Sequence, residues 1–305
     1  MLVIDIIHYD DFVTVYDMIE ADLKTPDDIT ILNEIEQLLS ISLPRVSRII
    51  VGRIGYKITH NRITQLSLYG IDSEIVLDKI FSLEKLEKLI LNESNLSFLP
   101  DTIGNLKNLQ VLLLKGNSLV NIPQSLLNLP NLRILDLSNN NLKTWNLREG
   151  ELPLLKVLEI NHNKLELVNF GENASFLLEE LYVNHNNVIT LNVDHLINLR
   201  NLSAQYNNLE AFPKVNNFKK LSVLELDYNH IKEFSINVDS LPNLENLSIN
   251  YNKIENIDFS NKKFQKLPHF YYSGNPIDKK CMKQLQHFVK AKAKARARTS
   301  SIFFS

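Results

Sequence analysis

Residues 109–119 are LQVLLLKGNSL and residues 132–142 are LRILDLSNNNL, two copies of the pattern that decides the fold. The pattern is leucine-x-x-leucine-x-leucine-x-x-asparagine-x-leucine, in which other apolar residues replace some leucines. Ten copies follow one another, and successive copies begin 21 to 23 residues apart. We number the positions of each copy from its first residue, which is Ile63, Leu86, Leu109, Leu132, Leu155, Leu178, Leu199, Leu221, Leu244 or Leu267. A period of this length predicts a solenoid in which each copy packs against its neighbours.

The residue types of the pattern have a physical explanation. Positions 4 and 6 point to the same side of a strand, so stacked copies form a parallel sheet over a continuous apolar core. Position 9 is asparagine in eight successive copies, from Asn117 to Asn275, and its amide can satisfy buried backbone groups where the chain turns. Position 14 is apolar, and proline follows it in three copies (Pro100, Pro123, Pro213). We therefore expect short, irregular convex segments with a few single helical turns.

Composition and cysteine usage indicate an intracellular protein. With 44% hydrophobic and 22% charged residues, the chain resembles ordinary soluble proteins. Its single cysteine, Cys281, excludes an internal disulfide. The N-terminus lacks a basic n-region, and no apolar run approaches the ~20 residues needed to span a bilayer. These features predict a cytoplasmic protein without a transmembrane segment.

Oppositely charged ends flank the repeats. Residues 1–40 contain ten acids and one lysine, a net charge of −9, whereas residues 279–298 contain eight basic residues and no acid, a net charge of +8. We expect an acidic N-terminal region and cap over residues 1–62, the solenoid over 63–277, and a capping helix with a basic tail over 278–305. Two interpretations of the tail are open: a solvated, frayed helix, or an electrostatic contact with an acidic partner or an anionic surface.

Both caps have recognisable helix signals. The first helix is expected to have Thr25 as its N-cap and to end before Ser42. Its apolar face would consist of Ile29, Leu32, Ile35, Leu38 and Leu39. Residues 48–51 and 55–58, followed by the turn residues His60 and Asn61 and a strand over 63–68, are expected to form a hairpin that leads into the first repeat. A second helix is expected near Asp278, and its core-facing residues would be Met282, Leu285, Phe288 and Val289.

The repeats resemble a known family. Residues 99–123, LPDTIGNLKNLQVLLLKGNSLVNIP, and 129–145, LPNLRILDLSNNNLKTW, resemble intracellular leucine-rich repeats of the Ras-group and plant disease-resistance types. Residues 32–46, LNEIEQLLSISLPRV, with 55–71, GYKITHNRITQLSLYGI, look like the N-terminal module of leucine-rich-repeat proteins of Asgard-type archaea. The resemblance implies an α/β solenoid: a horseshoe of about ten repeats with a parallel concave β-sheet, a helix and hairpin cap at the N-terminal end, and a helix cap at the other. By analogy it implies protein–protein recognition or scaffolding.

The side chains that point outward from the sheet, at positions 3, 5, 7 and 8, form what we call the concave face. Its early half is apolar, its later half is acidic and aromatic, and position 8 adds a column of rings. Such a mixture is typical of a protein-binding surface. The candidate partner-binding residues are Ile90, Leu113, Ile134, Asp136, Val157, Glu159, His162, Tyr182, His185, Tyr206, Glu225, Asp227, Tyr228 and Tyr251. The alternative is that the rings only cover the asparagines and that the valines reflect strand propensity.

Motifs of catalysis are missing: the sequence has no glycine-rich phosphate loop, paired-cysteine motif or His-Glu-x-x-His. His162 and His185, with Glu159 nearby, could form a metal or pH-sensing pair, but two imidazoles without a third fixed ligand are more often surface residues. We therefore expect no metal, cofactor, catalytic residue or small-molecule substrate.

The sequence thus predicts a non-enzymatic scaffold that holds a protein partner on its concave face. The alternative is a regulatory subunit or substrate adaptor of a signalling enzyme, such as a kinase, phosphatase, GTPase or ubiquitin ligase. This alternative requires a second contact surface, for which the N-terminal 40 residues are the best candidate.

Overall fold

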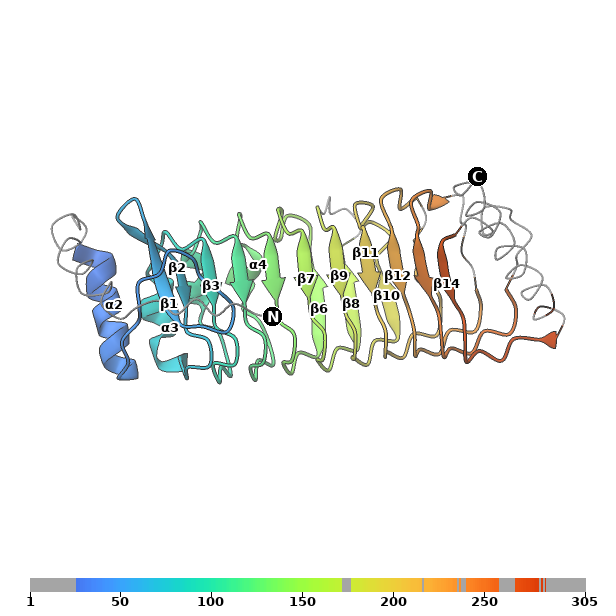
Figure 1. The fold of residues 1–305 in the computed structure, drawn as a ribbon, viewed down its shortest axis with the longest axis horizontal. Helices are drawn as coiled ribbons and strands as arrows, with labels where there is room; N and C mark the ends of the chain where they lie inside the picture. The colour runs from blue at the N-terminus through green and yellow to red at the C-terminus, as the bar shows by residue number, and fades with distance from the viewer. Residues whose placement is uncertain are drawn as a thin grey trace, which may run out of the picture.

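The chain folds into a long solenoid whose coils are stacked in sequence order (Figure 1). This computed structural model describes residues 26–171, 177–215, 217–234, 236, 240–257, 267–279, 281 and 283. Because strands that are neighbours in the main sheet come from successive copies of the pattern, each coil packs against the coils before and after it.

One side of the solenoid is an eleven-stranded sheet. Each copy of the pattern supplies one parallel strand, and the strands are in register, so equivalent positions of successive copies lie side by side. These strands are β2 (Arg62–Ser67), β3 (Lys88–Ile90), β4 (Val111–Leu113), β5 (Ile134–Asp136), β7 (Val157–Glu159), β9 (Glu180–Tyr182), β11 (Asn201–Ser203), β12 (Val223–Glu225), β13 (Asn246–Ser248) and β14 (His269–Tyr271). At the N-terminal edge, β1 (Gly55–Thr59) pairs antiparallel with β2.

The opposite side of the coils changes along the chain. In the first copies it contains short helices: η1 (Glu74–Val76), α3 (Leu77–Phe81), η2 (Asp101–Asn105) and α4 (Gln124–Leu127). In the middle copies it is a second parallel sheet, formed by β6 (Thr144–Leu147), β8 (Leu167–Phe170) and β10 (Thr190–Asn192). The predicted single helical turns are confirmed, whereas the second sheet is not part of the prediction.

The asparagines of position 9 join neighbouring coils. Asn140 is typical: its Oδ1 accepts a hydrogen bond from the Leu119 backbone N–H at 3.0 Å, and its Nδ2 donates to the carbonyls of Leu114 and Leu137. The other seven asparagines make the same three kinds of bond, each to its own coil and to the preceding one. The predicted role of the asparagines is confirmed.

At the N-terminal end, α2 (Pro26–Leu39) is anchored to the sheet through Asp28. Both oxygens of this buried carboxylate accept hydrogen bonds from the Arg62 guanidinium, at 2.9 Å each, and one also accepts from the Ile63 backbone N–H at 2.8 Å. Leu32 and Ile35 are buried as predicted, but Leu38 is 46% exposed. Leu38 therefore does not belong to the core-facing side of the helix.

The predicted hairpin is formed by β1 and β2, and its turn residues His60 and Asn61 both have positive φ, as a tight two-residue turn requires. Residues 48–51 form no strand.

At the C-terminal end of the solenoid, Asp278 Oδ1 accepts a hydrogen bond from the Cys281 backbone N–H at 2.6 Å, as an N-cap does, and residues 279, 281 and 283 are helical. The predicted core contacts of Met282, Leu285, Phe288 and Val289, and the basic tail, lie outside the described residues. In the described part of the chain, no helix has the length and apolar character needed to cross a membrane.

Candidate partner-binding face

The strand register arranges the concave face in rows that run across the sheet. The row at position 5 includes Leu113, Asp136, Glu159 and Tyr182, which pair directly from β4 to β9. The row at position 3 includes Val111, Ile134 and Val157 on the same strands. Side chains of one row are separated by the spacing of adjacent strands, about 4.8 Å, so they form one continuous surface.

The N-terminal part of this face is covered by the chain itself. Ile90 is fully buried although it points away from the core, and Ile49 and Ile90 are the two buried apolar residues, among those described, that do not belong to the core cluster. Nearby, the hydroxyl of Ser67 donates a hydrogen bond to the Arg53 carbonyl at 2.7 Å. The segment that connects α2 to β1 thus lies over β2 and β3. The interpretation of Ile90 as a partner-binding residue is wrong, because this segment excludes it from solvent.

Beyond this cover, the face has an apolar patch that we define as Val111, Leu113, Ile134 and Val157. All four side chains are partly exposed and come from three adjacent strands. Partly exposed aliphatic groups that lie next to one another can bind an apolar side chain of a partner, and they do not belong to the buried core.

Next to the patch lies what we call the acidic stripe: Asp136, Glu159, Glu180, Glu225 and Asp227. Asp136 is only 8% exposed, and its Oδ1 accepts from the Ser138 backbone N–H at 2.9 Å. Glu225 accepts hydrogen bonds from the side chains of Ser203 and Gln205. The stripe follows β5, β7, β9 and β12, and therefore extends across most of the later half of the sheet.

Burial and mutual repulsion act on the groups of the stripe. Burial, and then the charge of Asp136, raise the pKa of Glu159 above its usual range, while Lys115 acts in the opposite direction. Burial and a 2.7 Å hydrogen bond to Glu180 raise the pKa of Tyr182 to about 12. The tyrosine hydroxyl therefore remains protonated and donates to the carboxylate. These shifts come from burial first and from the neighbouring carboxylates second.

Asp227 has a structural role that the sequence analysis missed. It occupies position 7, where the side-chain oxygens of Asn161 and Asn184 accept a hydrogen bond from the backbone N–H of the next coil. Asp227 Oδ1 does the same with the Asn250 N–H and also accepts from the Ser248 hydroxyl, both at 2.6 Å. Burial raises the pKa of Asp227, whereas these hydrogen bonds oppose the shift. Asp227 thus belongs to the acidic stripe and also to a row of position-7 side chains that accept hydrogen bonds from the next coil, in addition to the row of position-9 asparagines.

Position 8 has a left-handed backbone conformation, which its residue types do not indicate in most copies. It lies in the left-handed region in all ten copies, with φ between 52° and 73°. Three copies have glycine there, but five have a histidine or tyrosine, for which this conformation is unusual and costs on the order of 1 kcal/mol or more.

The five rings form a continuous stack that we call the ring ladder: His162, His185, Tyr206, Tyr228 and Tyr251. Successive ring centroids lie 4.2 to 4.4 Å apart, and successive planes are within 12° of parallel. Face-to-face stacking covers the ring faces and leaves the polar edges in solvent, where Tyr251 is 51% exposed. Stacking of aromatic rings contributes roughly 0.5–1.5 kcal/mol per pair, which compensates part of the backbone strain.

The two histidines of the ladder are therefore held as stacked neighbours. Burial and the charge of His162 lower the pKa of His185, so His185 resists protonation. In the described residues, no three side chains of the metal-ligating types come together. Cys281 is buried, and its Sγ lies 3.4 Å from both the backbone nitrogen and the carbonyl oxygen of Ile257, a structural position.

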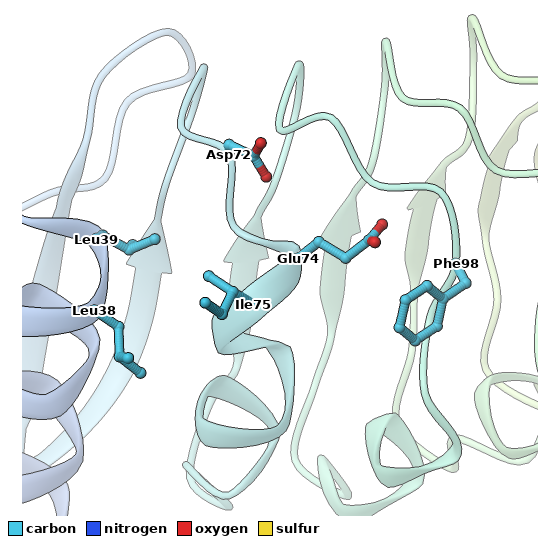
Figure 2. A pocket seen from close by; sticks show the side chains of 6 residues that line it. All are labelled: Leu38, Leu39, Asp72, Glu74, Ile75 and Phe98. Atoms are coloured by element: carbon cyan, nitrogen blue, oxygen red, sulfur yellow. The ribbon is translucent and has the colours of Figure 1, made fainter.

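A second exposed surface lies at the N-terminal end, away from the sheet face (Figure 2). An open groove of about 590 Å³ is lined by Leu38 and Leu39 at the end of α2, by Asp72, Glu74 and Ile75, and by Phe98 of the next coil. Ile75 is 71% exposed and Phe98 52% exposed. Both residues occupy position 13 of their copies, a position that the sequence analysis did not consider.

The repeats, the in-register strands and the line of asparagines have a counterpart among known families. The sequence profile described as leucine rich repeat matches residues 84–142. The chain has the fold of leucine-rich-repeat proteins. No curated protein matches this leucine-rich-repeat chain in sequence.

Solved structures share the fold of this leucine-rich-repeat protein. A plant ice-binding protein is 22% identical over 83% of this chain and 88% of its own, with a TM-score of 0.59. A chain of the Toll–Spatzle complex of Drosophila is 23% identical over 57% of this chain and 26% of its own, with a TM-score of 0.50. A leucine-rich-repeat protein of Leptospira interrogans is 22% identical over 77% of this chain and 76% of its own, with a TM-score of 0.42. At these identities the likeness concerns the fold alone.

Proposed function

We propose that this protein is a non-enzymatic scaffold that binds a protein partner on its concave face, across the apolar patch and the acidic stripe. The observation that carries the proposal is the direct pairing of Leu113, Asp136 and Glu159 in one row, where apolar and acidic groups meet. A leucine-rich-repeat fold supports protein interaction in general, and this row supports the choice of face.

The chemistry of the face defines the partner. A cation that approaches Glu159 relieves its repulsion with Asp136, and an apolar side chain of the partner can cover Val111 and Ile134. The partner should therefore present a basic or mixed surface with an apolar anchor. The polar edges of the ring ladder border the stripe and offer hydrogen-bond donors at the rim.

Purification of partners with matched variants tests the proposal. The double variant Glu159→Lys/Glu180→Lys reverses charge on the stripe without touching the nearly buried Asp136. The control is Glu84→Lys/Glu166→Lys, which changes two exposed acids outside the concave face. We expect specific partners to be lost with the first variant and retained with the control. Retention of every partner by the folded stripe variant would disprove the choice of face.

We also propose an alternative, a regulatory subunit or substrate adaptor of a signalling enzyme, because the groove of Figure 2 provides a second apolar surface. Ile75→Glu should then remove one partner while leaving the partner of the stripe bound. Identical partner sets for Ile75→Glu and wild type would contradict the adaptor function. The free, buried thiol of Cys281 is compatible with the cytoplasmic location that we infer.

A further inference from the structure

The acidic stripe has no ion-pair partner within the part of the chain that the structure describes. The salt bridges there use other carboxylates, namely those of Asp28, Glu34, Glu179 and Asp194. Lys115 acts on Glu159 only through space, as one charge against several. Half-buried carboxylates that repel one another favour the approach of cations from outside the sheet.

A second, independent feature lies within the stripe. The hydroxyl of Ser138 is buried, with the residue only 4% exposed, and has no hydrogen-bond partner among the described residues. Ser138 occupies position 7 and so lies on the same side of the sheet as Asp136, to which its backbone N–H donates. A buried hydroxyl without a partner is unfavourable, and a donor or acceptor that reaches the stripe would satisfy it.

The stripe is linear, which restricts what can bind along it. Asp136 on β5 and Glu225 on β12 share position 5 and are four strands apart, about 19 Å at the usual strand spacing. An extended segment that runs along this row places alternate side chains on the sheet side, one every ~6.6–6.8 Å. Three or four cations at every second residue therefore match the length of the stripe.

The chain contains one segment with this pattern. Residues 290–298 are KAKAKARAR, with five cations separated by single alanines. On a helix these cations would be distributed around the axis, but on an extended chain they all point to one side. Alanine on the other side adds little bulk.

We propose that residues 290–298 bind, as an extended strand of cations, along the acidic stripe of the same molecule. This inference rests on the proposed function, because it assigns to the partner-binding face an occupant that competes with the partner. Cys281 is held at Ile257, on the side of the coil opposite the acidic stripe, so the tail has to pass around the coil to reach Glu225.

Tethering makes even weak ion pairs effective. A tail joined to the solenoid by a few residues is present at an effective concentration in the millimolar range. Each exposed ion pair contributes little, so the tail should be displaced by a partner and by salt. The tail thus acts as a competitor of low affinity and not as a permanent cover.

The test uses the full chain and a labelled peptide of residues 290–299 as probe, with binding measured by fluorescence anisotropy at low and at physiological salt. In one variant, all five tail cations are replaced by glutamine. We expect this chain to bind the peptide about threefold to tenfold more tightly than wild type, because its own tail no longer competes. In that background, Glu159→Gln/Glu180→Gln/Glu225→Gln should weaken binding several-fold. The control Glu84→Gln/Glu166→Gln/Glu255→Gln, which changes exposed acids outside the stripe, should not.

The outcomes separate the two proposals. Equal affinity of wild type and the tail variant, with binding still weakened by the stripe variant, overturns the tail as occupant and leaves the proposed function standing. A peptide that binds without regard to the stripe variant overturns both. Sedimentation velocity of the full chain decides between one molecule and two: dimers that vanish in the tail variant would show that the tail binds a second copy and would overturn binding within one molecule.

Discussion

The phenol ring of Tyr251 lies directly against the α-carbon of Gly274. A Cβ atom at Gly274 would overlap Cδ1 of that ring. Gly274 occupies position 8 of the last copy, with φ of 72°, and so continues the backbone conformation of the ring ladder without a side chain. The ladder therefore ends on a glycine because the last ring fills the space that the next side chain would need.

Gly274→Ala should lower the free energy of unfolding by about 2–4 kcal/mol, because it combines backbone strain with the displacement of Tyr251. Gly70→Ala is a matched control. Gly70 occupies position 8 of the first copy with φ of 71°, but a Cβ there meets nothing within 4 Å. Gly70→Ala should lower the free energy of unfolding by about 1 kcal/mol, because only the backbone strain acts there. Urea unfolding of both variants measures the difference, and equal costs would show that the ring moves freely.

Asp28→Asn should destabilise the protein by about 2–4 kcal/mol, since it removes the charge that satisfies Arg62 and weakens three hydrogen bonds at a buried site. Glu34→Gln is the control. Glu34 lies on the same helix as Asp28, and its ion pair with Lys79 of α3 is exposed. That change should cost less than about 1 kcal/mol. Thermal unfolding followed by circular dichroism measures both, and a similar loss in the two variants would contradict the anchoring role of Asp28.

Glu159→Gln should stabilise the protein at pH 7 by up to about 1 kcal/mol, after allowance for solvent screening of a half-exposed group. The pKa of Glu159 is raised in the folded state, so folded protein binds this proton more readily than unfolded protein. Wild-type stability should therefore rise as the pH falls through the folded pKa toward the ordinary value of 4.5. The advantage of the variant should shrink over the same range. Urea unfolding at pH 7 and pH 5 measures this, and a constant advantage would be contrary evidence.

Asn163→Ala should cost about 2–4 kcal/mol, because it leaves the Leu142 N–H and the Leu137 carbonyl without their partner in the core. Asn163→Ser should cost less. The protein itself contains serine at this position in the second copy, where the Ser94 hydroxyl donates to the Leu68 carbonyl at 3.0 Å. Chemical denaturation ranks the two variants, and a serine variant no more stable than the alanine variant would contradict this order.

The parts of the fold that could be predicted are those set by spacing within one copy. The strands, the buried positions 4 and 6 and the role of Asn140 all depend on residues close in sequence, and repetition strengthens each signal. The left-handed position 8 could also have been predicted, since Gly70, Gly116 and Gly274 share it. Bulky rings in the middle copies concealed that signal.

What could not be predicted depends on how distant segments are placed. Ile90 has the same pattern position as Leu113, yet it is buried because the segment around Arg53 lies over β2 and β3. Leu38 fits the helical period but is 46% exposed, whereas the next residue, Leu39, packs against the core. The acidic stripe was predicted in composition, but the bonds that fix Asp227 become visible only in the register of neighbouring coils.

The second sheet has a cause in single residues. Where proline follows position 14, a short helix begins at Pro100 and at Pro123, whereas none begins at Pro213. Where asparagine follows instead, at Asn146, Asn169 and Asn192, the chain continues as β6, β8 and β10. Proline has no N–H to give to a strand ladder, whereas asparagine has one, and the Asn169 amide donates to Asn146 Oδ1 at 2.9 Å.

This exchange has a consequence for the curvature of the array. Helices need up to about 10 Å between axes, whereas strands need about 4.8 Å, so a coil with a helix on one side is a wedge and a coil with strands on both sides is a slab. Wedges bend a stack and slabs keep it straight. In the five copies that contain Pro100, Pro123, Asn146, Asn169 or Asn192, the residue after position 14 thus distinguishes wedge-shaped coils from flat ones. An array assembled from copies of these two kinds in a chosen order should contain bends and straight sections in the same order.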